Sequence, residues 1–518
     1  MELPPVPSQS IDLLPAVQAE RSKARHQLDA GLSDLSEWTV TAAPVLPLHR
    51  FELEAFSRLM ALGCLLVALW WSHRLSTSAP AVLRRGRAGY LFRGWASNDV
   101  RTRFGVLWLK RPEYELMSGS GPARLAPEDR RMGLAAGRMS LGVHLLTAWL
   151  VAQTTFDDAV SVLGKLSGYA PSKRSSLGIA DQLGPIAAQF LDDLPAPDDD
   201  GEVLVISYDD KAAPMLRAST HGKRCKPHKK RPAGMARRKV RRLRRKENSR
   251  PRRKKGDKTK NGRSAKLAVV YTLRRMPDGS FEGPVNRRIL GTFGSRATLV
   301  EMVKKEAALR GYPKKRTIFL ADGATTLWDI WRTHFDQAIP CLDWFHLCEY
   351  LWSAGNAIHE EGSKELAAWV HARQDELRLG DIDGVLAALK VLEAGIGRSG
   401  PGTKGRRDRV RKARTYVENH REQIRYAELL RDGLDIGTGV MEGAVKHTVA
   451  ARLDGSGMQW SPQRAEHVLA LRLVLVNDRW AAFEKHAMER HEQDTEWAVP
   501  RLTPKGRQNI DPACLEAA

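Results

Sequence analysis

The chain has 518 residues and a formal net charge of +23, and its 42% hydrophobic content permits a sizeable core, which excludes a disordered protein. The charge predicts an anionic partner, and five irregularly spaced cysteines exclude a disulfide framework and are typical of a reducing compartment. The longest apolar run, Leu59 to Trp71, is shorter than the roughly 20 residues that cross a bilayer, which favours a buried helix and no membrane partner.

The first part of the chain is predicted to hold two regions. Residues 1–85 form an N-terminal helical region, with a helix from Phe51 to His73, and residues 86–125 form a small β-ribbon around Gly105. Arginines alternate with aromatic residues in this ribbon. The alternation suits a surface that faces nucleic acid, and it fits a sheet with one solvated face equally well.

Residues 126–198 are predicted to be helical. An apolar pattern runs from Asp129 to Leu150, and after a Gly-containing turn Ser172 is placed to cap a further helix. A helix, a turn and a capped helix are compatible with a helix-turn-helix DNA-binding region, and ordinary helical packing is the alternative. The acidic, Pro-containing stretch 195–200 then indicates a linker.

From residue 199 the pattern changes to an α/β domain. Three strands are predicted first, Val203 to Tyr208, Leu267 to Leu273 and Arg288 to Thr292. A helix, the strand Thr317 to Leu320, another helix and a strand from Ala338 to Leu342 follow. This order predicts an RNase H-like core, with residues 199–345 as its first part.

Acidic residues stand where these strands end. Asp209, Asp322 and Asp343 each follow a predicted strand, and Glu442 lies in the first turn of a later helix. Carboxylates at the carboxyl edge of one sheet are suitable ligands for Mg²⁺, with Mn²⁺ as an alternative. Asp209, Asp322 and Glu442 are therefore the predicted metal ligands and catalytic residues of a two-metal phosphoryl-transfer site. Asp210 is an alternative to Asp209 as the first ligand.

The positive charge is concentrated in one segment. Between Lys223 and Arg263 there are 22 Lys or Arg residues and two acids. Because this segment interrupts the α/β domain close to Asp209, residues 217–264 are predicted to be a basic insertion that contacts DNA phosphates. Its candidate DNA-binding residues are Arg241, Arg242, Arg244, Arg245, Lys254 and Lys255.

The last part of the chain is predicted to complete the core. Residues 346–432 form a helical insertion, residues 433–480 form the last part of the core, and residues 481–518 form a loose tail. The helix that starts at Glu442 is expected to expose Lys446 and Arg452 to DNA. Trp460 is expected either to stack on an unpaired base or to pack in the core.

The chain resembles bacterial insertion-sequence transposases of the ISKra type, which are relatives of the Mutator-like DDE enzymes. The resemblance covers residues from about 85 to 480 and rests on four motifs: Asp209-x-Lys211, Ala321-Asp322-Gly323-Ala324, Asp343-x-x-His346, and Gly439 to Ala444 followed by Gly457 to Ser461. It implies an RNase H-like fold with a helical insertion and metal-dependent strand cleavage and transfer on DNA. It also implies metal ligation by the three acids, near-site support by Asp343 and His346, and a role for Lys211 beside the first acid.

The predicted function is therefore a DDE transposase that binds the element's ends and target DNA. The resemblance implies a homo-oligomer on paired ends and a cytoplasmic, nucleoid-associated location in a bacterium. A purely structural role for His346 fits its position as well as a catalytic role does. Two alternatives to the whole prediction are a domesticated, non-catalytic DNA-binding protein and a Mg²⁺-dependent RNase H-like nuclease or resolvase.

Overall fold

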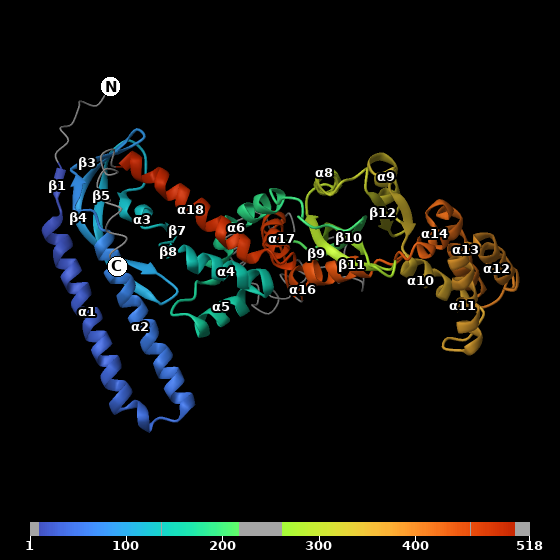
Figure 1. Cartoon of the computed structure of the whole chain (residues 1–518), viewed down its shortest axis with the longest axis horizontal. Helices are drawn as coiled ribbons and strands as arrows, with labels where there is room; N and C mark the ends of the chain where they lie inside the picture. Colours follow the sequence, from blue (N-terminus) through green and yellow to red (C-terminus); the bar gives the residue numbers. More distant parts are fainter. Residues whose placement is uncertain (1–9, 136, 217–261, 456, 503–518) are drawn as a thin grey trace, which may run out of the picture. The chain divides into compact units, whose positions relative to one another are not determined.

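The computed structural model describes residues 10–135, 137–216, 262–455 and 457–502, with backbone only for 495–502. The chain forms two compact units, residues 1–186 with 479–518, and residues 187–478. Figure 1 shows that the chain contains both α-helices and β-sheets. Each unit is described by itself.

The first unit combines a helical hairpin, a β-sheet and a group of further helices. Its helices are α1 (Leu14–Thr41), α2 (Leu48–Arg74), α3 (Pro127–Arg131), α4 (Leu141–Gln153), α5 (Phe156–Leu166) and α18 (Trp480–Leu502), and α6 (Lys173–Asp192) crosses the boundary between the units. Its strands are β1 (Ser10–Asp12), β2 (Ser78–Pro80), β3 (Val82–Arg85), β4 (Ala88–Arg101), β5 (Val106–Ser118), β6 (Arg124–Leu125), β7 (Leu134–Ala135) and β8 (Met139–Ser140).

The β-ribbon predicted from the sequence is the antiparallel pair β4 and β5, which turns at Gly105. Leu107 and Leu109 are buried, whereas Trp108 between them is 72% exposed, so the alternation reflects one packed and one solvated face. Arg111 does not lie on the solvated face. Its side chain is 2% exposed and donates a hydrogen bond of 2.9 Å to Asp129.

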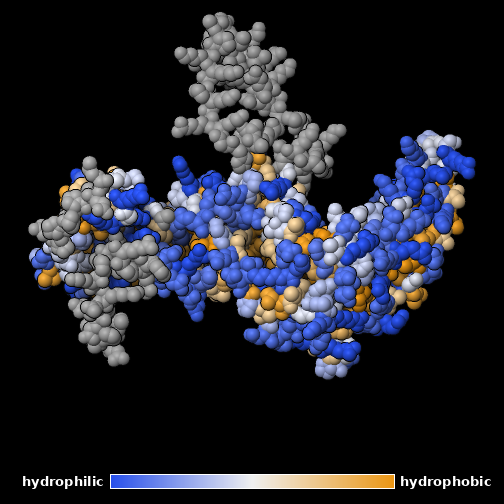
Figure 2. Space-filling view, turned by 90° about the horizontal axis from the view of Figure 1, so that it is seen from above, coloured by the Kyte–Doolittle hydropathy of each residue, from blue (hydrophilic) through white to orange (hydrophobic). Residues whose placement is uncertain are grey.

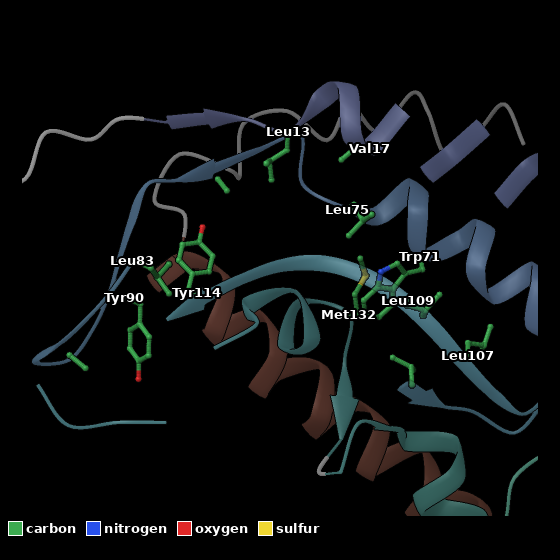
Figure 3. Packing of buried hydrophobic residues seen from close by; sticks show 13 residues of the cluster. Leu13, Val17, Trp71, Leu75, Leu83, Tyr90, Leu107, Leu109, Tyr114 and Met132 are labelled. Atoms are coloured by element: carbon green, nitrogen blue, oxygen red, sulfur yellow. The ribbon is translucent and has the colours of Figure 1, made fainter. Parts of the chain in front are cut away.

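The core of this unit lies where the helical hairpin meets the sheet. Trp71 and Leu75 near the end of α2 pack with Leu107 and Leu109 of β5 (Figure 3). The rest of α2 does not follow the prediction of a buried helix, because only 11% of its most apolar 18-residue window is buried. Among the described residues, α2 is the one helix whose length and composition would allow it to span a membrane, and one such helix is weak evidence for a membrane protein.

Two other predictions for this unit are wrong. The apolar pattern from 129 to 150 is not one helix, because Gly133 and Gly137 adopt positive φ angles of 70° and 75° and separate α3 from α4. The predicted loose tail after residue 480 begins instead with helix α18, which packs on this unit. Phe483 and Ala487 of α18 are buried, and His491 Nε2 lies 2.8 Å from the Gly133 carbonyl oxygen.

The second unit is an α/β domain followed by a block of helices. Its strands are β9 (Val203–Pro214), β10 (Gly262–Arg275), β11 (Phe281–Thr292), β12 (Arg316–Ala321) and β13 (Ile339–Leu342). Its helices are α8 (Arg296–Leu309), α9 (Thr325–His334), α10 (Trp344–Gly355), α11 (Lys364–Leu379), α12 (Ile382–Ala394), α13 (Thr403–Asn419), α14 (Tyr426–Arg431), α15 (Gly439–Val445), α16 (Ala451–Leu453) and α17 (Pro462–Val476).

The five strands of this unit form one sheet in the order β11-β10-β9-β12-β13. The first three are antiparallel, and β9, β12 and β13 are parallel. Strand β9 extends beyond the predicted end at Asp209 to Pro214, which pairs with Gly262 of β10. The predicted basic insertion therefore connects the ends of a β-hairpin, and residues 217–261 lie outside the described part of the chain.

The block of helices comprises α10 to α14, and its α13 packs against α10 and α12. The sequence between 406 and 432 predicts one long helix, but α13 ends at Asn419 and α14 begins at Tyr426. Figure 2 shows a mostly hydrophilic face on this block, at the right-hand end of the view. The predicted helix after Glu442 is also interrupted. Residues Lys446–Ala450 form a π-helix between α15 and α16, an irregularity that is common near functional sites.

Candidate functional site

Two acids lie side by side at one edge of the sheet. Strands β9 and β12 run parallel with Leu320 opposite Ser207, so the next residues of the same orientation are Asp322 and Asp209. Asp209 is partly buried, and this burial raises the pKa of its carboxyl. The backbone N–H of Asp210 donates a hydrogen bond to the Asp209 carboxylate, which opposes the rise in pKa. The nearby charge of Asp322 adds to the rise. The two carboxylates are therefore close enough to repel each other.

Asp210 has partners of its own on other elements. Its carboxylate lies 2.7 Å from the guanidinium of Arg296 on α8 and accepts a hydrogen bond of 3.2 Å from Ser264 Oγ on β10. The pKa of Asp209 instead responds to the charges of Asp322, Asp210 and His346, which lie near its carboxyl. This geometry favours Asp209 over Asp210 as a residue that is available to a ligand.

Asp343 is a buried residue with a full set of hydrogen bonds. It caps α10 by accepting the N–H of His346 at 3.0 Å, and its Oδ2 lies 2.5 Å from Nδ1 of the same histidine. Its other oxygen accepts the N–H of Thr438 at 2.9 Å. Because Thr438 directly precedes α15, Asp343 ties the start of α10 to the start of the helix that carries Glu442.

The pKa values of this pair shift in opposite directions. The hydrogen bond to Asp343 raises the pKa of His346 to about 9, against an opposing effect of burial, and the charge of Asp322 adds to the rise. Burial acts to raise the pKa of Asp343, but its hydrogen bonds with His346 and Thr438 outweigh burial and lower it. His346 is therefore an imidazolium at neutral pH and carries a positive charge beside the two acids.

Glu442 is an exposed residue on α15, a helix that contacts β9 and β10. The structure thus places Glu442 on an element that adjoins the strand of Asp209. Among residues 10–135, 137–216, 262–455 and 457–494, no three His, Cys, Asp or Glu side chains form a group that could hold a metal ion. Asp209 and Asp322 supply two adjacent oxygen donors of the kind Mg²⁺ prefers, and Glu442 does not complete a group of three with them.

The candidate DNA-binding residues differ in their exposure to solvent. Lys446 is exposed as predicted, and Lys211 is partly exposed on β9. The prediction that Arg452 is exposed is wrong, since its side chain is 1% exposed and its guanidinium lies 5.0 Å from the ring of Trp460. Burial lowers the pKa of Arg452 to about 10. The predicted arginines and lysines between 241 and 255 lie outside the described residues.

Trp460 adopts the core position of its two predicted alternatives. Its side chain is 5% exposed, and its Nε1 donates a hydrogen bond of 2.9 Å to the carbonyl of Leu453. Its backbone pairs with the end of β9: the Trp460 N–H donates a hydrogen bond to the Pro214 carbonyl, and the Trp460 carbonyl accepts one from the Leu216 N–H. In this conformation the indole ring is not accessible to a base.

Sequence analysis did not identify the aromatic residues that adjoin Asp322. Tyr416 of α13 lies directly over Gly323, where an added Cβ would come within 2.2 Å of its ring. Burial raises the pKa of the Tyr416 hydroxyl, and the nearby charge of Asp322 raises it further. His420 Nε2 lies 3.2 Å from the Gly323 carbonyl oxygen. A sequence signal for these contacts is lacking, because α13 is remote from Asp322 in the chain.

No family model and no curated protein matches the sequence. Among solved structures, the chain is similar to the Drosophila P element transposase strand transfer complex. The two are 10% identical with a TM-score of 0.23, over 65% of this chain and 79% of that chain. A TM-score this low assigns neither a fold nor a function.

Proposed function

We propose that this chain is a DDE-type transposase of the ISKra type, which cleaves the ends of an insertion sequence and joins them to target DNA. The order β11-β10-β9-β12-β13, with three antiparallel strands followed by two parallel ones, supports an RNase H-like core. The helical block after β13 supports a helical insertion, and the basic segment between β9 and β10 supports contact with DNA phosphates.

The observation that carries the proposal is the adjacency of Asp209 and Asp322 at the ends of the two central parallel strands. Ligands of α/β sheets bind at this carboxyl edge. Two carboxylates that repel each other gain stability from a cation between them. Their oxygen atoms are suited to Mg²⁺ or Mn²⁺.

In this proposal Asp209, Asp322 and Glu442 hold the metal ions. When bound, a metal pair stabilises the attacking and leaving oxygens of a displacement at phosphorus. Glu442 contributes its carboxylate from the first turn of α15, which requires the exposed side chain to approach the two aspartates. The proposed metal site therefore consists of two adjacent carboxylates, Asp209 and Asp322, and a third carboxylate, Glu442, on a neighbouring helix.

The remaining residues position the site and bind DNA. Asp343 fixes the start of α15 through Thr438 and holds His346 as a cation beside the acids. A cation at this position favours the approach of a DNA phosphate. Lys446, which is exposed, and Lys211, which is partly exposed, are proposed to contact the DNA backbone. Asp343 and His346 are thus proposed as positioning residues.

The proposed partners are the ends of the element and target DNA. A homo-oligomer assembled on paired ends and a location in the bacterial cytoplasm, in association with the nucleoid, belong to the same proposal. The net charge of +23 supports an anionic partner of this kind.

The proposal is tested by incubating the full-length protein with a labelled duplex that carries an element end, in Mg²⁺ or Mn²⁺. The wild type is expected to release a 3′-hydroxyl and join it to a second duplex. Asp322→Asn and Glu442→Gln are each expected to retain less than about 1% of both activities, because each removes an ionised oxygen donor.

Three other outcomes of this assay would contradict the proposal. Metal-dependent cleavage without joining would identify the RNase H-like nuclease or resolvase alternative. Salt-sensitive binding without cleavage in either metal would identify the non-catalytic DNA-binding alternative. Full joining activity in Asp322→Asn would exclude this site as the catalytic centre.

A further inference from the structure

A polar groove with a volume of about 710 Å³ opens beside Asp322, and we call it the α9–α13 groove. Trp328 and Arg332 of α9, Tyr350 of α10, Lys412 and Tyr416 of α13, and Gln423 line it. Gly323, which directly follows the acid, belongs to the same lining. The groove therefore begins at the proposed catalytic edge and extends along the helical block.

Aromatic rings form one wall of the groove. Tyr350 and Tyr416 stack with a centroid distance of 4.1 Å and an interplanar angle of 17°. His420 continues the row, with its ring centroid 4.6 Å from that of Tyr416. Tyr416 lies between the other two rings, so Tyr350, which is partly exposed at the end of the row, is the ring that can offer a stacking surface to an unpaired base.

Two polar atoms of the lining are buried without a hydrogen-bond partner among the described residues. They are the indole Nε1 of Trp328 and the amide Oε1 of Gln423, and each residue is 2% exposed. Burying a polar atom without a partner is unfavourable, so both atoms would gain stability from a hydrogen bond with a ligand group. One is a donor and the other an acceptor, which matches the mixed edge of a nucleobase.

Positive charges stand at the rim of the groove. The side chains of Arg332 and Arg411 are 53% and 58% exposed, and each forms an ion pair with an acid three residues away on its own helix. Exposed pairs of this type contribute little, so a phosphate can replace the acid as a partner. Lys412 is also exposed beside Arg411.

From this combination we infer that the α9–α13 groove binds an unpaired nucleotide of the DNA strand at the active site. The base contacts Trp328, Gln423 and the aromatic wall, and the phosphates contact Arg332, Arg411 and Lys412. The inference rests on the proposed function for the identity of the strand. The inference specifies that the DNA end carries unpaired nucleotides when it is bound, and that the helical block binds these nucleotides.

The test measures binding of the full-length protein to two fluorescent DNAs in EDTA. One is a paired duplex, and the other is the same duplex with a short single-stranded extension. The double substitution Arg411→Ala/Lys412→Ala is expected to weaken binding of the extended DNA about tenfold and of the paired duplex less than about twofold, because these two residues contact the phosphates of the unpaired nucleotides only.

The matched control is Lys404→Ala/Arg406→Ala, which removes two exposed charges from the same helix outside the groove lining. This control is expected to affect both DNAs equally. Equal losses on both DNAs for the Arg411→Ala/Lys412→Ala protein would overturn the inference. The same would follow if the control variant discriminated between the two DNAs.

A second variant addresses the buried donor. Trp328→Phe keeps an aromatic ring but removes the unpaired Nε1 atom, and it is expected to weaken binding of the extended DNA while binding of the paired duplex reports how much of the protein remains folded. Unchanged preference for the extended DNA would count against the base contact. Asp322→Asn is expected to keep the preference, because the acid does not line the groove. A wild-type protein that prefers the extended DNA but neither cleaves nor joins it would refute the proposed function and leave the groove assignment standing.

Discussion

At the scale of single residues, the site depends on which of two neighbouring carboxylates is already paired. Asp210 has an arginine and a serine as partners, whereas Asp209 faces another acid. The sequence alone left these two residues ambiguous, because a strand of uncertain length does not specify which side chain faces which element. The partners on α8 and β10 supply that information.

The ion pair between His346 and Asp343 predicts a pH dependence of stability. The pKa of His346 is raised from 6.5 to about 9, so the protonated form stabilises the fold fully below pH 6.5, and this contribution is lost as the pH rises through about 9. The pKa of Asp343 is lowered from 3.8, so its contribution is present above pH 3.8 and is lost only in more acidic solution.

His346→Gln retains a neutral donor and removes the charge. The difference in free energy of unfolding between wild type and this variant is expected to be largest at pH 5 to 6 and to vanish near pH 10. Urea denaturation at a series of pH values measures it. A difference that does not change between pH 6 and pH 10 would show that the charge of His346 does not stabilise the fold.

At the scale of elements, the strands of the α/β domain and most of its helices were predictable. Runs such as Val203 to Tyr208 are continuous and apolar because parallel strands are buried on both faces. Helix starts were visible as caps, for example Ser172, whose hydroxyl accepts the N–H of Ser175. The adjacency of Asp209 and Asp322 followed from these strands.

Contacts between distant elements were not predictable. Arg452 and Trp460 have the composition of a DNA-binding surface, but they pack on each other and on the end of β9. Tyr416 approaches Asp322 only because α13 folds back over the start of α9. Periodicity describes the exposed and buried sides of one helix, and it carries no information about such partners.

The contact between α13 and Gly323 yields a prediction of its own. Gly323→Ala would place a Cβ 2.2 Å from the Tyr416 ring, which is held between Tyr350 and His420. We expect a loss of about 1–3 kcal/mol in the free energy of unfolding, because a well-packed ring has no room to move. Urea denaturation followed by circular dichroism measures the loss.

Gly405 of α13 provides the matched control. No atom lies within 4 Å of an added Cβ at this position, so Gly405→Ala is expected to stabilise the protein by up to about 1 kcal/mol through helix propensity. Equal effects of the two substitutions would show that the close approach of Tyr416 to Gly323 does not occur.

At the scale of the whole molecule, the chain separates into two units that are not two consecutive segments. Helix α18 returns to the unit formed by the N-terminal residues, where it packs against α3 and α4. The sequence pattern predicted consecutive regions and a loose tail, since polar composition near a terminus is typical of disorder. The buried face of α18 depends on partners more than 300 residues away.

The proposed transposase has its catalytic centre at the edge of the sheet where β9 and β12 end. The most direct measurement compares strand cleavage and joining by Asp209→Asn and Asp210→Asn proteins on the same element-end DNA in Mg²⁺. We predict that Asp209→Asn retains less than about 1% of wild-type activity, whereas Asp210→Asn retains activity within a few-fold of wild type. Activity that survives in Asp209→Asn and is lost in Asp210→Asn would contradict the assignment of the site.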